Sequence, residues 1–200
     1  MIRAVRVGGS SFVRRVLGAL VLERATYREV AADPSTLETL AQAAAVTVAG
    51  GAAQTIGLAG LWDEGTGIDG SSLAVGAVAS LLAWIVPTAI LWWVALRLLR
   101  APAPLPALLR AVGFAAAPGL LYVACAVLTR ATEQTVLAWT IAAFAWLLSQ
   151  GALYVAVQET LGTGTLRTLA AFAIAGVATA VVGLALAAAL PDPLWQALVF

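Results

Sequence analysis

The sequence predicts an all-α integral membrane protein, a polytopic bundle of five transmembrane helices that follows a cytoplasmic amphipathic N-terminal helix. Of its 200 residues, 62% are hydrophobic and only 10% are charged, and the mean hydropathy is +0.97. A soluble globular domain is typically about half apolar and about a quarter charged. Apolar stretches long enough to cross the hydrocarbon core of a bilayer also recur five times along the chain.

The five predicted spans each contain about 20 residues or more, which is the length that an α-helix needs to cross a membrane. They are residues 37–61, 72–96, 107–128, 135–157 and 167–190. An odd number of spans places the two chain ends on opposite sides of the membrane. The predicted organisation is therefore an N-terminal segment over 1–36, a membrane domain over 37–190 and a short tail over 191–200.

The arginines predict which end faces the cytoplasm. All eleven basic residues are arginine. All except Arg130 belong to the N-terminal segment or to the second and fourth connections, counting Arg110 and Arg167 in the first turn of the spans that follow them. Basic residues concentrate on the cytoplasmic side of membrane proteins. We therefore expect a cytoplasmic N-terminus and an external C-terminus, with Trp92 and Trp93 near the inner interface. Abundant alanine without lysine favours a bacterial origin, and hence the plasma or inner membrane.

Residues 11–24 are predicted to form an amphipathic helix on the cytoplasmic surface. At 100° per residue its apolar side chains cover one face and its arginines lie opposite. The apolar face contains Phe12, Val13, Val16, Leu17 and Leu20, and the other face contains Arg14, Arg15 and Gly18. Such a helix would place its arginines on the phosphates of anionic lipids. The alternative is a helix that packs on the protein's own cytoplasmic loops.

The stretch TYREVAADPS, residues 26–35, is predicted to be a hinge between this helix and the first span. Asp33 followed by Pro34 suits an N-cap with proline at the first helical position, and Ser35 with Glu38 suits a capping box. Either arrangement would satisfy free backbone amides where the first span begins.

The hinge also carries side chains that could contact lipid headgroups or a partner protein. These are Tyr27, Arg28, Glu29 and Asp33, which join Arg14 and Arg15 as the predicted contact residues. The alternative is an ordinary solvated linker without a partner.

The apolar spans contain few groups that could carry chemistry. No ionisable residue occupies the middle of a span, whereas proton relays and ion-coupled transport generally require one there. The chain has no histidine and one cysteine, so it cannot assemble a zinc cluster or a histidine-ligated haem by itself. We therefore expect no catalytic residue, no metal and no cofactor, and a net charge of +1 does not favour nucleic acid as a partner.

Four residues inside the spans have predicted structural roles. Pro87 and Pro118 each lack a backbone donor and should kink the second and third spans. Gln54 and Gln150 should form hydrogen bonds between helices.

Small residues recur at four-residue spacing, as in Ala49, Ala53 and Gly57 and again in Gly176 and Ala180. That spacing permits close approach of helices. It is compatible with a homo-oligomer as well as with packing inside one chain.

Three stretches carry a resemblance to a known family. The segment LERATYREVAADPSTLETLAQAAAV, residues 22–46, resembles the N-terminal signature of bacterial members of the Yip1 family, a Tyr-x-Glu-hydrophobic-x-x-Asp-Pro phrase before the first span. Its positions are occupied by Tyr27, Glu29, Val30, Asp33 and Pro34. Residues 109–118, with an arginine, Gly-Phe-Ala and a proline, and residues 146–159 followed by Thr-Gly and Arg167 are also similar to this family.

The resemblance covers residues from about 20 to 190 and departs at Gln158, where a basic residue is expected. It implies a five-helix membrane scaffold with a cytoplasmic N-terminal segment. The leading hypothesis is a nonenzymatic scaffold that docks lipid headgroups or a partner protein through that segment. The alternative is an accessory structural subunit of a larger energy-converting or transport complex, and a weaker one is a channel or small-solute transporter lined by the kinked spans.

Overall fold

The computed structural model describes residues 8–62, 70–101, 103–132 and 135–189, and within these ranges it contains helices and no strand. The all-α prediction is therefore confirmed for the described chain, whereas the predicted tail 191–200 lies outside it. The helices are α1 (Gly8–Leu20), α2 (Arg24–Ala32), α3 (Thr36–Trp62), α4 (Gly70–Arg97), α5 (Leu105–Phe114), the 3-10 helix η1 (Ala117–Leu121), α6 (Tyr122–Thr132), α7 (Thr135–Leu161) and α8 (Thr165–Ala189).

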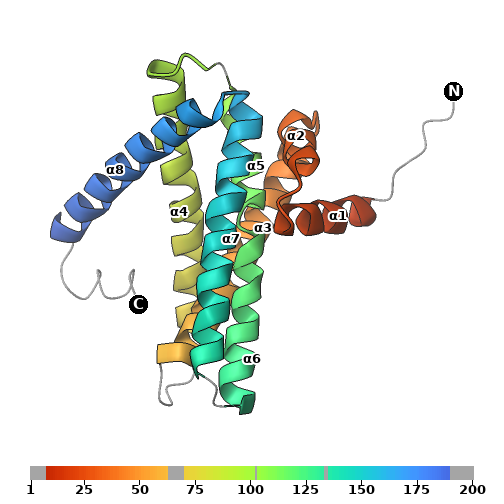
Figure 1. The fold of residues 1–200 in the computed structure, drawn as a ribbon, viewed down its shortest axis with the longest axis vertical. Helices are drawn as coiled ribbons and strands as arrows, with labels where there is room; N and C mark the ends of the chain where they lie inside the picture. Colours follow the sequence, from red (N-terminus) through yellow and green to blue (C-terminus); the bar gives the residue numbers. More distant parts are fainter. Residues whose placement is uncertain (1–7, 63–69, 102, 133–134, 190–200) are drawn as a thin grey trace, which may run out of the picture.

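Helices α3, α4, α6 and α7 run along the long axis of the molecule, α8 leaves the bundle at an angle, and α1 lies across it (Figure 1). Four stretches of the described chain are long enough and apolar enough to cross a membrane. They are Leu73–Arg97, Leu105–Thr129, Thr135–Leu161 and Thr165–Val182, and they overlap the second to fifth predicted spans. The chain is therefore a multi-pass integral membrane protein. The first predicted span overlaps α3, whose crossing of the membrane stays a prediction.

The third predicted span is not one helix. Residues 107–128 are divided between α5, the 3-10 helix η1 and α6, and Pro118 lies in the first turn of η1. Proline has no N–H to donate to the preceding turn, so the interruption falls where the sequence has its helix breaker. Pro87, in contrast, lies inside the single helix α4, and a kink there stays a prediction.

The small residues of α3 pack inside the chain. A Cβ added to Gly57 would lie 2.3 Å from the carbonyl oxygen of Tyr122, and one added to Gly50 would lie 2.8 Å from that of Ala116. Such short distances show that backbone meets backbone between α3 and the η1–α6 segment. The same test at Gly176 of α8 finds no atom within 4 Å. Of the predicted α3 stripe, Ala53 and Gly57 are buried whereas Ala49 is exposed, so only part of that stripe is used for packing within the chain.

The predicted interhelical contacts of Gln54 and Gln150 do not form within the part of the chain that the structure describes. Both side chains are exposed, Gln54 on α3 and Gln150 on α7, and neither bonds to a described residue. Both glutamines face outward because the inward-facing positions of these helices are occupied by small apolar residues, such as Ala53 and Ala152.

The N-terminal segment folds differently from the prediction of one helix over 11–24 and a hinge over 26–35. The first helix ends at Leu20, a new helix begins at Arg24, and Leu22 between them has a left-handed φ of 58°. Leu22 packs against the core, and a Cβ on Gly151 of α7 would lie 2.9 Å from its Cδ2 atom. This tertiary contact turns the chain, and the predicted hinge is helical as far as Ala32.

Candidate functional site

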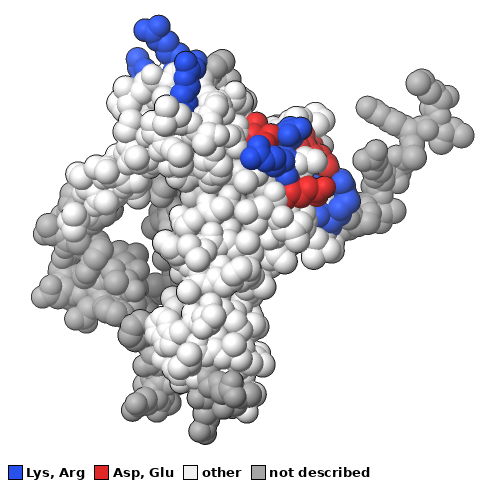
Figure 2. Space-filling model, in the orientation of Figure 1, with Lys and Arg blue, Asp and Glu red and all other residues white. Residues whose placement is uncertain are grey.

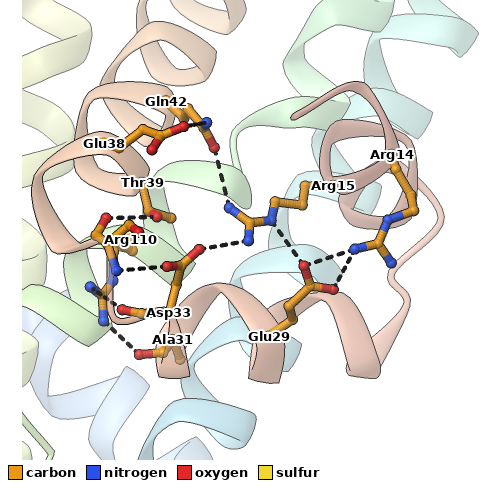
Figure 3. Close-up of polar contacts among 10 residues, drawn as sticks. Arg14, Arg15, Glu29, Ala31, Asp33, Glu38, Thr39, Gln42 and Arg110 are labelled. Carbon is orange, nitrogen blue, oxygen red and sulfur yellow. Dashed lines mark hydrogen bonds and ion pairs between the residues drawn. The ribbon is translucent and has the colours of Figure 1, made fainter. Parts of the chain in front are cut away.

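Basic and acidic side chains lie together where α1 and α2 meet the bundle (Figure 2). We call Arg14, Arg15, Glu29, Asp33 and Arg110 the N-terminal clamp, because they tie α1, α2 and the bundle together (Figure 3). Their contacts come from helices far apart in sequence: α1 supplies Arg14 and Arg15, α2 supplies Glu29, and α5 supplies Arg110.

Arg15 is the centre of the clamp. Its Nη2 atom lies 2.6 Å from Oδ2 of Asp33, its Nε lies 3.1 Å from Oε1 of Glu29, and its Nη1 donates to Oε1 of Gln42 at 3.4 Å. A guanidinium presents five donors in a fixed planar fork, so it can hold several acceptors at once. This one side chain therefore joins α1 to α2, to the α2–α3 connection and to α3.

Glu29 accepts from both arginines of α1. Nη2 of Arg14 lies 2.8 and 2.7 Å from the two carboxylate oxygens of Glu29. Burial alone raises the pKa of Glu29, but the hydrogen bonds and charges of Arg14 and Arg15 outweigh it, so this pKa lies below its ordinary value. Glu29 is therefore anionic at neutral pH and neutralises part of the charge of the arginine pair.

Asp33 ends α2 rather than capping the first span. Helix α3 begins at Thr36, so the Asp33–Pro34 pair lies two residues too early to be the predicted cap. Oδ1 of Asp33 accepts from the backbone N–H of Ser35 at 2.8 Å. Burial raises the pKa of Asp33, but the Ser35 N–H, the Arg15 guanidinium and the Thr39 hydroxyl together hold it below its ordinary value.

Arg110 is a clamp residue that the sequence did not single out as a contact residue. The residue is buried in α5, and its guanidinium donates to the carbonyl oxygens of Ala31 at 2.6 Å and Asp33 at 3.0 Å. Carbonyls at a helix C-terminus lack intrahelical partners and carry partial negative charge. Arg110 thus caps α2. The available signal was an arginine placed inside an otherwise apolar helix.

Tyr27 is not available to a partner as predicted. Its side chain is fully buried, and its hydroxyl donates to the carbonyl oxygen of Ala19 at 2.9 Å. The same carbonyl in the last turn of α1 also accepts the backbone N–H of Leu22 at 3.1 Å, so the hydroxyl is its second donor and ties Tyr27 to the end of α1. The position of Tyr27 beneath α1 could not be read from the sequence, because it depends on the reversal at Leu22.

A second polar contact fixes α2 to α7. Nη1 of Arg24 lies 3.0 Å from Oε1 of Glu159, and Arg28 donates to Oε2 of the same carboxylate. Both arginine side chains remain largely exposed, whereas Glu159 is mostly buried. The predicted contact residue Arg28 therefore already has an intramolecular partner.

The clamp leaves one apolar strip uncovered along α1 and the turn that follows it. Phe12 packs against Phe114 of α5 with ring centroids 6.3 Å apart, whereas Val13, Leu17 and Val21 are exposed. These three line a shallow depression beside Arg14, Gly18 and Glu23. The predicted apolar face of α1 is thus shared between the bundle and the surroundings.

The described residues contain no group of three or more His, Cys, Asp or Glu side chains placed to hold a metal ion. The clamp's carboxylates are instead satisfied by arginines and backbone amides. Its geometry suits the fixing of a segment, since each charged group is held by partners from a different element.

The sequence model of the Yip1 domain matches residues 17–187. The chain belongs to the Yip1 domain family. The Yip1 domain match extends from the last turn of α1 to α8, so it includes the α2 segment as well as the helical bundle. No similar curated protein and no similar solved structure was found. In this Yip1-domain protein the residues of the N-terminal phrase, Tyr27, Glu29 and Asp33, contact other parts of the same chain.

Proposed function

We propose that this Yip1-domain protein is a nonenzymatic membrane scaffold whose N-terminal segment is held in a fixed position and docks lipid headgroups. The clamp is the observation that carries the proposal. Arg15 joins α1 to α2 and to Asp33 in a largely desolvated contact, while the apolar strip Val13, Leu17 and Val21 stays uncovered. A helix that is fixed across the long axis of a bundle, with one apolar strip free, suits the interface plane of a bilayer.

The membrane arrangement belongs to the same proposal. Helix α3 has 27 residues, which span about 40 Å at 1.5 Å per residue, so its length supports a fifth crossing. The arginine distribution supports a cytoplasmic N-terminus and an external C-terminus in the plasma or inner membrane. A C-terminal fusion to alkaline phosphatase should then be active, and a fusion to green fluorescent protein should be dark; the reverse result contradicts this orientation.

Site-directed spin labelling of the full chain in lipid nanodiscs tests the docking. In a Cys125→Ala background, a label at Leu17→Cys should be accessible to oxygen, which partitions into lipid, and shielded from a water-soluble nickel reagent. A label at Ala25→Cys, an exposed position of α2, is the matched control and should show the opposite accessibility. Nickel access at residue 17 would reject lipid docking, and shielding from both reagents would indicate a protein partner instead.

A second candidate function, an accessory subunit of a larger membrane assembly, is supported by Gln54 and Gln150. An amide exposed to hydrocarbon without a partner is costly, and a neighbouring transmembrane helix would supply that partner. Native electrophoresis with mass spectrometry after mild detergent extraction distinguishes the two functions. One large species with fixed partners supports the subunit, and a small species without partners supports the scaffold.

A further inference from the structure

We infer that Arg97, Arg100 and Arg167 form a surface that binds the phosphate groups of anionic lipids, separate from the N-terminal segment. We call these three residues the arginine patch. They lie where α4 ends and α8 begins, and Figure 2 shows basic side chains without acidic neighbours at that end of the visible face.

The pairing of the arginines distinguishes this patch from the N-terminal segment. Arg14, Arg15, Arg24 and Arg28 each form an ion pair with a carboxylate. The three patch arginines are exposed and pair with no carboxylate of the described chain. Glu159 at the end of α7 is already held by Arg24 and Arg28. The patch therefore keeps its positive charge available for an anion from outside the chain.

The patch is built on a rigid part of the molecule. One core cluster buries side chains from both helices and from the connection after α4. Its members include Val94 and Ala95 of α4, Ala101 and Ala103 of the connection, and Ala171 of α8. Nε1 of Trp92 also donates to the carbonyl oxygen of Ala103 at 3.0 Å. The three arginines are thus carried by elements that pack on one another, so their charges act at one place.

The neighbouring side chains identify the anion as a lipid headgroup. Four large apolar side chains next to the patch are exposed to the surroundings. Their exposed fractions are 54% for Trp93, 40% for Leu96, 82% for Leu166 and 50% for Leu169. The patch lies at the ends of two of the stretches that are long and apolar enough to cross a membrane. Tryptophan prefers the membrane interface, and arginine extends its apolar stem along such a surface while its guanidinium binds phosphate in a planar fork. A soluble anion would not require this apolar surround.

Arg100 allows a clean substitution. Its φ is 51°, a left-handed conformation that is unfavourable for most residues but that asparagine tolerates. Arg100→Asn therefore removes the charge without adding backbone strain. The variant separates loss of a lipid contact from loss of the fold.

The full chain is reconstituted in phosphatidylcholine nanodiscs with a minority of spin-labelled phosphatidylglycerol, and the enrichment of the label around the protein is measured against labelled phosphatidylcholine. The test variant is Arg97→Gln/Arg100→Asn/Arg167→Gln. The matched control, Arg14→Gln/Arg24→Gln/Arg28→Gln, changes the net charge equally but removes paired arginines.

We expect the enrichment of phosphatidylglycerol to fall by a factor on the order of five for each patch arginine that is removed. In the parent chain the enrichment should fall with added salt. In the control variant it should change little. Arg100→Asn alone should give part of the loss with unchanged thermal unfolding. Unchanged enrichment in the test variant, or an equal loss in the control, would overturn the inference. The spin label at residue 17 reports on the N-terminal segment independently, so failure of one proposal is distinguishable from failure of the other.

Discussion

Nη2 of Arg15 lies 2.6 Å from Oδ2 of Asp33, and the two side chains are only 12% and 11% exposed. The pair joins the middle of α1 to the end of α2, where Arg110 of α5 also binds the backbone. The position of α1 therefore depends on a nearly buried ion pair, in which the loss of one member leaves an unpaired charge with little access to water.

Replacing Arg15 by Met should weaken the attachment of α1 by about 2 kcal/mol, between the values typical of exposed and buried pairs. Hydrogen exchange of the α1 amides measures this as faster local opening. Arg14→Met is the matched control, since its side chain is 60% exposed and should cost less than about 1 kcal/mol. A double-mutant cycle with Asp33→Asn should show coupling between Arg15 and Asp33, and additive effects would contradict the role of the pair.

Replacing Tyr27 by Phe should destabilise the protein by about 1 kcal/mol, because a buried hydrogen bond to the carbonyl of Ala19 is lost. Thermal unfolding in detergent measures the effect. Tyr154→Phe provides a control, since the hydroxyl of this partly buried tyrosine bonds to no described residue. If Tyr27→Phe leaves stability unchanged but weakens association with another protein, Tyr27 is a partner contact after all.

Replacing Gly57 by Ala should destabilise the bundle by about 1–3 kcal/mol, because the added methyl meets the backbone of Tyr122 and forces α3 and α6 apart. Backbone atoms cannot move aside as a flexible side chain can. Gly176→Ala, in open space on α8, should be neutral or stabilising by up to about 1 kcal/mol. Equal changes in the unfolding temperatures of the two variants would contradict the close α3–α6 approach.

Acidification should release α1 from the bundle. The pKa values of Glu29 and Asp33 are lowered in the folded protein, so their stabilising contribution is complete above the unfolded pKa values and is lost as the pH falls through the folded ones. We expect docking to be constant above about pH 5 and to weaken progressively below about pH 4. A fluorophore on Val13→Cys, in the Cys125→Ala background, should report the release.

The Asp33→Asn variant is the control for this titration, because one of the two acidic groups no longer titrates. Its dependence on pH should be shallower than that of the parent chain. Release centred near neutral pH would point to a different titrating group and contradict this assignment.

Composition and periodicity predicted the helical membrane class, and four of the five expected spans coincide with stretches that are long and apolar enough to cross a membrane. The N-terminal phrase containing Tyr27, Glu29 and Asp33 also led to the family that residues 17–187 match. Pro118 marked the place where the third span is interrupted over Ala117–Leu121. Local sequence did not predict the reversal at Leu22 or the capping role of Arg110. Each depends on a residue distant in the sequence.

The sequence by itself determined that the chain enters the membrane, because a bilayer selects apolar segments of sufficient length one at a time. The tertiary structure decided which charged and polar side chains already have a partner within the described chain and which remain available to a partner outside it. Tyr27 and Asp33 read as surface contacts in the sequence but are enclosed by α1 and the bundle. Arg100 and Arg167, in contrast, remain exposed and pair with no carboxylate of the described residues. Pairing and burial are properties of atoms brought together across the fold, and no local pattern encodes them.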